Sequence, residues 1–211
     1  MVIIKAPTAD ATKQIFQPYA IAMGELVYSW NHLQEDLAGL FWRLSQIENG
    51  AIAFAIWHST ANDHAQRSML RAVAEVALAE KTEVRAEVVW LLDKIDYSLR
   101  HKRNDAIHAP LTLFTDQNGT TVIPYDMTNN PRADSLEGKE ILKELIWYRE
   151  TAEVLRGFCW QLSHSLHPAR PQPLPQRPTL PHLGPQTTSK GKPQAKRDKA
   201  LQPRRRSIRE I

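Results

Sequence analysis

The fold is decided by residues 84–110, which read Val84-Arg-Ala-Glu-Val-Val-Trp-Leu-Leu-Asp-Lys-Ile-Asp-Tyr-Ser-Leu-Arg-His-Lys-Arg-Asn-Asp-Ala-Ile-His-Ala-Pro110. Apolar residues recur there at helical spacing, at Val84, Val88, Leu92, Ile95 and Leu99. The pattern predicts one long helix that continues to His108. Pro110 ends it, because the residue before a proline is biased away from helical geometry.

Similar patterns flank this stretch. A first amphipathic helix is expected after Pro18, which can sit in a first helical turn, and Gly50 is expected to break it. Apolar residues from Ile52 to Val76 predict a second helix, with a kink near residues 59–62. A last helix, with an apolar face from Leu142 to Leu166, ends before Pro168. Short connections favour a bundle of antiparallel neighbours.

One segment between the third and last helices has a different character. Leu111-Thr-Leu-Phe-Thr115 and Thr120-Thr-Val-Ile123 flank an Asn118-Gly119 pair, which favours a tight hairpin turn. A β-hairpin is therefore expected at about residues 111–124. The predicted fold class is all-α, a bundle of four to five helices over residues 1–167 with a small inserted hairpin.

The C-terminal region, residues 168–211, differs from the rest in charge. It holds nine of the 14 prolines, and eleven Lys and Arg against two acidic residues, so the tail carries +9 and the preceding body −5. The tail has too few large apolar residues to offset the loss of conformational entropy on folding, so it is expected to be a disordered basic tail. Its Leu174-Pro-Gln-Arg-Pro178 stretch is typical of the polyproline II conformation. Such a stretch could serve as a stiff spacer or as a proline-rich recognition motif. The basic clusters could attract RNA or shield the acidic body.

Composition also bounds the class of protein. The single cysteine, Cys159, cannot form an internal disulfide, and the N-terminal residues 1–10 lack the features of a secretory signal. No apolar run is long enough to span a bilayer. A cytoplasmic protein without membrane contact is expected. Cys159, His164 and His167 lack a fourth metal ligand, and no glycine-rich phosphate loop occurs, so neither metal nor cofactor is expected.

Six tryptophans, Trp30, Trp42, Trp57, Trp90, Trp147 and Trp160, are distributed over the predicted helices. Large aromatic side chains dominate the packing of cores and interfaces. A shared aromatic core is therefore expected, with a minority of the rings in a subunit interface as the alternative.

The chemistry of the chain is concentrated at the end of the third helix. Arg103 continues the buried stripe of Ile95 and Leu99, so its charge requires either a carboxylate or a bound anion. His108 lies about 140° around an ideal helix from Arg103. The two side chains converge only if the last turn unwinds or a second copy completes the site. The carbonyls of a helix end favour the protonated imidazole, which could donate a proton, and Asn104 could orient a phosphate or cap the helix.

Four further residues are weaker candidates for contacts with RNA. Arg100 and Lys102 belong to the same polar cluster, Asn31 interrupts the apolar stripe of the first helix, and Asp63 lies with Ser59 and Arg67 along one edge of the second helix. Asn31 could equally belong to a solvated flank. An ion pair between Asp63 and Arg67, four positions apart on a helix, would explain Asp63 without any function.

The hexapeptide Arg103-Asn-Asp-Ala-Ile-His108, late in a third helix, resembles the signature of the HEPN superfamily of helical proteins. The likeness covers roughly residues 19–167 in helix order. It implies a metal-independent endoribonuclease that acts as a homodimer, in which the RNA 2′-hydroxyl is the nucleophile. Arg103 would stabilise the phosphorane, His108 would act as general acid or base, and Asn104 would be the polar motif residue. A toxin or defence role and a cognate inhibitor protein are implied in the same way.

Two alternatives remain open from the sequence. A HEPN-like bundle can lack catalysis and bind nucleotide, RNA or a partner protein at the same place. The chain could also be an interaction module in which Arg103 belongs to an internal ion pair and the tail docks a partner.

Overall fold

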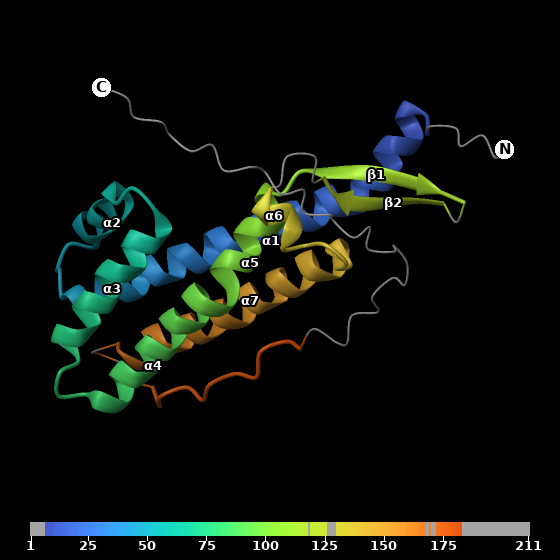
Figure 1. Ribbon diagram of the computed structural model, residues 1–211. Helices are drawn as coiled ribbons and strands as arrows, with labels where there is room; N and C mark the ends of the chain where they lie inside the picture. Colours follow the sequence, from blue (N-terminus) through green and yellow to red (C-terminus); the bar gives the residue numbers. More distant parts are fainter. Residues whose placement is uncertain (1–6, 118, 126–129, 168, 170–171, 183–211) are drawn as a thin grey trace, which may run out of the picture.

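The computed structural model describes residues 7–117, 119–125, 130–167, 169 and 172–182. Helices dominate it and a two-stranded hairpin lies at one end, which confirms the predicted helical class (Figure 1). The elements, in chain order, are α1 (Ala9–Ser45), α2 (Gly50–Ser59), α3 (Asp63–Ala77), α4 (Thr82–Asp93), the π-helix η1 (Lys94–Arg100), α5 (His101–His108), β1 (Leu111–Asp116), β2 (Gly119–Pro124), α6 (Pro131–Asp134) and α7 (Ile141–Ser165).

The first helix is longer than predicted at its N-terminal end. Thr8 caps α1 by accepting a hydrogen bond from the Ala11 amide at 3.3 Å, so the helix starts well before Pro18. Pro18 lies inside the helix and not in its first turn, which corrects the expectation. The C-terminal end also differs, because Gln46 adopts the left-handed conformation (φ 57°) and ends α1 before Gly50. Gly50 is instead the first residue of α2.

The predicted second helix is two helices. The kink expected near residues 59–62 is a complete break between α2 and α3. The Asn62 side chain starts α3 by accepting a hydrogen bond from the Ala65 amide at 2.9 Å. This break allows α3 to pack on both α1 and α4 (Figure 1), and Arg67 of α3 reaches Asp96 of η1.

The two longest helices, α1 and α7, run parallel, whereas antiparallel neighbours were expected. Cross-helix pairs rise together along both chains, from Glu25 with Arg149 (2.5 Å) to Arg43 with Ser163 (2.8 Å). The unit α4–η1–α5 runs in the opposite direction and returns the chain toward the N-terminal part of α1 (Figure 1). There the hairpin and α6 lead into α7, which must therefore start at the same end as α1.

The inserted hairpin is confirmed. β1 pairs antiparallel with β2 in a register that joins Leu111 to Pro124 and Asp116 to Gly119. The Tyr125 amide donates to the Pro110 carbonyl at 2.7 Å and closes the base of the hairpin beside the end of α5. Gly119 has φ +131°, a conformation that favours glycine, while Asn118 of the predicted turn lies outside the described residues.

The predicted aromatic core is only partly correct. Trp30 and Trp57 are buried, but Trp42 and Trp160 are 37% and 52% exposed on the outer faces of α1 and α7. The core is chiefly aliphatic and lies between α1, α7 and the α4–η1–α5 unit. Within the described part of the chain, no helix is both long and apolar enough to cross a membrane.

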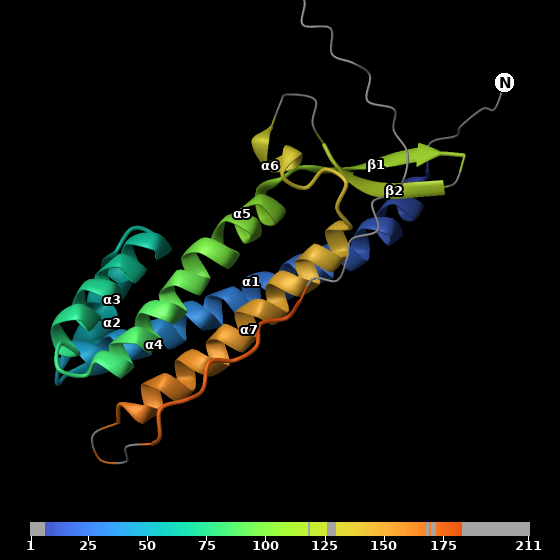
Figure 2. The same cartoon turned by 60° about the horizontal axis from the view of Figure 1, so that its bottom comes forward.

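Part of the predicted disordered tail is docked on the body, which corrects the expectation of disorder from about Pro168. Residues 172–182 form an extended segment that runs alongside α7 (Figure 2). Leu174 and Leu180 pack against the hydrophobic core, and these contacts hold a segment that was expected to lack them. Residues 168, 170–171 and 183–211 of the predicted tail, with its basic clusters, lie outside the described residues.

Cys159 is expected to be chemically inert in the folded protein. Its side chain is fully buried on α7, and this burial, together with the nearby Asp36 charge, raises the pKa of the thiol. Because the thiolate is the reactive form, an aromatic disulfide reagent should modify Cys159 only at the rate of unfolding. Absorbance measurements with and without guanidinium test this. Rapid stoichiometric labelling of the native protein would contradict the burial.

Candidate functional site

The predicted motif lies at the end of the third helical unit, as expected, but the helix that leads to it is not uniform. Residues 94–100 form a π-helix between α4 and α5. Wider turns of this kind are frequent at functional sites. Here Ile95, Asp96 and Leu99 are all buried, so the π-helix directs a carboxylate into the body along with two apolar side chains.

The partner of this carboxylate is Arg67 of α3, which is fully buried. Its Nε donates to Asp96 Oδ1 at 3.0 Å, and its Nη2 lies 2.9 Å from the same oxygen. The predicted pair between Arg67 and Asp63 is confirmed at 3.6 Å, but it is the looser of the two contacts. With Asp96 and Asp63 around it, the Arg67 charge is compensated, as a buried charge requires.

Arg103 occupies a different electrostatic position on α5. Its guanidinium lies 4.7 Å from the centre of the Trp30 ring, and its Nη1 donates to Asn104 Oδ1 at 2.7 Å. Burial lowers the pKa of Arg103, the neighbouring Arg67 charge lowers it further, and Asp63 opposes both effects. Arg103 therefore carries a half-buried charge that the surrounding protein stabilises incompletely.

No described carboxylate forms an ion pair with Arg103, and its Nε is buried without a hydrogen-bond partner among the described residues. The internal ion pair that the sequence offered as an alternative for Arg103 is thus made by Arg67 instead. An arginine of this kind can donate to a planar or tetrahedral anion in its fixed fork geometry. The site is suited to a phosphate or carboxylate group.

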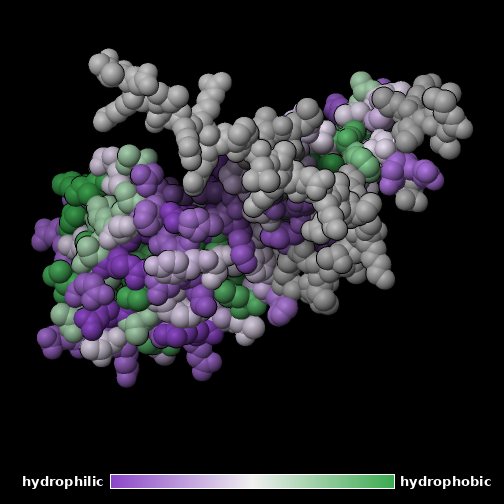
Figure 3. Space-filling view, in the orientation of Figure 1, coloured by the Kyte–Doolittle hydropathy of each residue, from purple (hydrophilic) through white to green (hydrophobic). Residues whose placement is uncertain are grey.

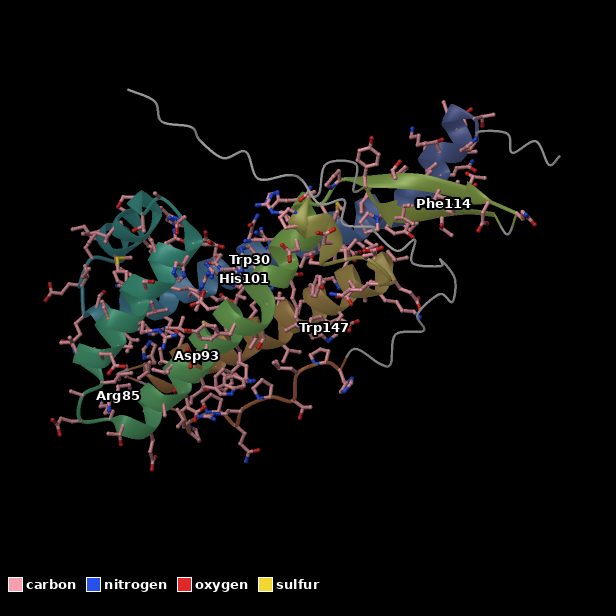
Figure 4. The ribbon with its side chains drawn as sticks, in the orientation of Figure 1. Trp30, Arg85, Asp93, His101, Phe114 and Trp147 are labelled. Carbon is pink, nitrogen blue, oxygen red and sulfur yellow. The ribbon has the colours of Figure 1, made fainter. Side chains whose placement is uncertain are left out.

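The surroundings of Arg103 have an excess of positive charge. Arg100 lies 3.7 Å from Asp96 through its Nε and 2.9 Å from His101 through its Nη2. Three guanidinium groups, those of Arg67, Arg100 and Arg103, thus share the two carboxylates Asp63 and Asp96. Trp30 on α1 and His101 on α5 lie in this central region (Figure 4), where hydrophilic residues gather across the visible face (Figure 3).

His108 is not brought to Arg103 within one chain. α5 stays helical through His108, and the Ala109 amide donates to the Asp105 carbonyl at 2.8 Å, so the last turn does not unwind. Five helical residues separate the two side chains by about 140° around the axis and about 7 Å along it. His108 is exposed while Arg103 faces Trp30. Any shared chemistry requires a second copy of the chain or a substrate that reaches both groups.

The weaker candidates divide between two sides of the molecule. Asp63 belongs to the Arg67 cluster, and Arg100 contacts Asp96 there. Lys102 instead points to α7, where its Nζ lies 5.0 Å from the Trp147 ring centre. Asn31 is exposed on α1 and makes no side-chain hydrogen bond with the described residues. Sequence reasoning missed the roles of Asp96 and Gln34, whose Oε1 accepts from Arg67 Nη1 at 3.4 Å.

The remaining features add no further ligand set. Within the described part of the chain, no three His, Cys, Asp or Glu side chains are grouped as metal ligands would be. Two surface hollows between α1 and α7, lined in part by Glu153, contain none of the motif residues. Comparison with protein-family models, with curated proteins and with solved structures found no match for this chain.

Proposed function

We propose that this protein is a metal-independent endoribonuclease in which Arg103 binds the scissile phosphate and His108 of a second copy transfers a proton. The observation that carries the proposal is the half-buried Arg103, which stacks on Trp30 and has, among the described residues, neither a hydrogen-bond partner for its Nε nor an ion-paired carboxylate. Such a guanidinium group fits an arginine whose charge is compensated by a bound anion. The resemblance of residues 103–108 to the HEPN motif supports RNA as the source of that anion.

The chemistry assigns one role to each motif residue. The RNA 2′-oxygen attacks its own phosphorus, the bond to the 5′-oxygen breaks, and a 2′,3′-cyclic phosphate forms. Arg103 donates to the negative charge that develops on the phosphorane, with Asn104 holding its guanidinium in place. An imidazolium at His108 gives its proton to the departing 5′-oxygen. Water outside the site can accept the 2′-hydroxyl proton.

The positions of Arg103 and His108 on α5 also determine which oligomeric state the proposed reaction requires. Because Arg103 and His108 diverge on α5, one chain alone does not present both groups to one phosphodiester. A twofold assembly would bring His108 of each copy to Arg103 of the other, giving two equivalent sites. We therefore include a homodimer in the proposal. A defence or growth-arrest role, a cognate inhibitor and a cytoplasmic location rest on the resemblance and composition.

Cleavage is expected to be independent of divalent metal, because the proposed chemistry uses only the 2′-hydroxyl and protein side chains. Excess EDTA should leave the initial rate on a labelled single-stranded RNA unchanged, and the 5′ product should end in a 2′,3′-cyclic phosphate. Electrophoresis before and after acid treatment distinguishes this end group from a 3′-hydroxyl. Strict dependence on Mg²⁺, or 3′-hydroxyl products, would exclude the scheme.

A binding module without catalysis is the second candidate, and the divergence of Arg103 and His108 within one chain favours it. In that case the Arg103 site binds an RNA phosphate and no bond is cleaved. Full-length protein that binds RNA, loses the binding on Arg103→Met and shows no cleavage would select this candidate. The salt dependence of binding reports the number of phosphate contacts in either case.

A further inference from the structure

The segment 172–182 contacts the body at positions three apart. Leu174 and Leu180 pack against the hydrophobic core, and Arg177 between them bonds to Glu87 of α4 although it is exposed, as are positions 173, 176, 179 and 182. Pro175, Pro178 and Pro181 form a half-buried row beside the contact row. Three residues per turn is the repeat of the polyproline II helix. The segment therefore presents one face of such a helix to the body.

The surface under the segment matches this face chemically. Arg177 Nε donates to Glu87 Oε2 at 2.8 Å, and the guanidinium lies 5.5 Å from the centre of the Trp90 ring. At the other end, Trp147 Nε1 donates to the Pro181 carbonyl at 2.6 Å. Trp147 lies on α7 between α5 and the docked segment (Figure 4). An acidic residue, two indole rings and one indole N–H donor thus lie under the segment on the surface formed by α4 and α7, which is called the α4–α7 groove below.

Two of these contacts are ones by which aromatic grooves bind polyproline II ligands, namely an indole N–H that donates to a ligand carbonyl and an acidic side chain that selects a ligand arginine. The Trp90 ring here packs against the guanidinium of that arginine. Trp90 and Trp147 are half-buried with the segment in place. The segment packs along this face of α7 (Figure 2) and contacts both residues.

We propose that the α4–α7 groove, defined by Glu87, Trp90 and Trp147, is a recognition site for proline-rich segments of the pattern Leu-Pro-x-Arg-Pro-x-Leu-Pro. Residues 174–181 of this chain have that pattern and occupy the groove as a built-in ligand. A partner protein with a segment of the same chemistry binds by displacing them. The site is separate from the Arg103 cluster, and the proposal is independent of RNA cleavage.

The built-in ligand has a large kinetic and thermodynamic advantage over any free peptide. Only residues 166–171 connect it to the end of α7, so its effective concentration at the groove is on the order of millimolar. Weakening the segment in the full-length chain removes this competitor and leaves the groove intact. The triple variant Leu174→Ala, Arg177→Ala and Leu180→Ala does this without altering any helix.

The test is the affinity of a fluorescein-labelled peptide of residues 172–182, measured by anisotropy, for the full-length chain. The triple variant should bind it at least about tenfold more tightly than the unaltered protein does. Glu87→Gln or Trp147→Phe in the triple-variant background should abolish that gain, and so should Ala at the arginine of the peptide. Two replacements are used because Glu87→Gln removes one half-buried charge at nearly constant shape and leaves the packing of Trp147 untouched.

The proposal is overturned if the triple variant and the unaltered protein bind the peptide equally, or if the groove replacements have no effect on the gain. Light scattering gives an independent readout. An unaltered protein that is dimeric and becomes monomeric in the triple variant would place the segment in the groove of a second copy, which also overturns occupancy within one chain.

Discussion

RNA cleavage by the His108→Ala variant is expected to be about 10²- to 10⁴-fold slower than by the unaltered chain, the range that a positioned general acid or base contributes. Without the imidazole, the departing 5′-oxygen must take its proton from water. His108 is exposed at the end of α5, so the replacement should leave folding unchanged. Initial rates on a labelled RNA, with circular dichroism as the check of folding, measure the effect.

His58→Ala is the matched control for this variant. His58 is also exposed, and its one charged partner among the described residues is Glu35 of α1, at 3.7 Å. Its removal should change the cleavage rate by less than about twofold, within the usual effect of a surface substitution. If His108→Ala retains full activity, the assignment of the proton donor is wrong, whatever the control shows.

Arg67→Met is expected to cost about 3–5 kcal/mol of unfolding free energy, because it removes the nearest partner of the buried Asp96 carboxylate and leaves only the longer contacts with Arg100 and His64. For a chain of this size the melting temperature should fall by roughly 6–20 °C. Urea unfolding followed by circular dichroism measures the loss. The double variant Arg67→Met with Asp96→Leu removes both charges and should recover most of it.

Arg103→Met provides the contrast that separates the two arginines. Arg103 makes no ion pair with a described residue, so its loss should cost about 1 kcal/mol or less, chiefly the contact with Trp30. A large stability loss at Arg103 together with a small loss at Arg67 would reverse the roles assigned here. Arg103 would then be the structural residue, and the anion site would lose its basis.

The helical units were predictable because their apolar residues repeat at helical spacing, and the hairpin was predictable from one dipeptide in a β-rich stretch. The start of α1 was missed because its cap, Thr8, precedes a stretch with no clear apolar stripe. The π-helix was missed because its apolar residues fit an ordinary α-helix equally well. Parallel packing of α1 and α7 follows from where the hairpin returns the chain, which local patterns do not encode.

The candidate site likewise has features that local sequence patterns predict and others that only the fold reveals. Arg103 and its need for an anionic partner followed from one helix face. The link between Arg67 and Asp96 joins residues 29 positions apart, so only the fold could reveal it. The docked segment was missed because composition was averaged over residues 168–211. Its side-chain contacts come from Leu174, Arg177 and Leu180, spaced three apart, and the Pro181 carbonyl adds a hydrogen bond from Trp147.

The central claim is that Arg103 of one copy and His108 of another act on the same phosphodiester, and a mixture of two inactive variants tests it most directly. Arg103→Met and His108→Ala should each be nearly inactive alone. Mixed in equal amounts and allowed to exchange subunits, they should regain about a quarter of the unaltered activity, because half of the dimers then hold one intact site of two. A mixture that stays as inactive as its components would contradict the shared site.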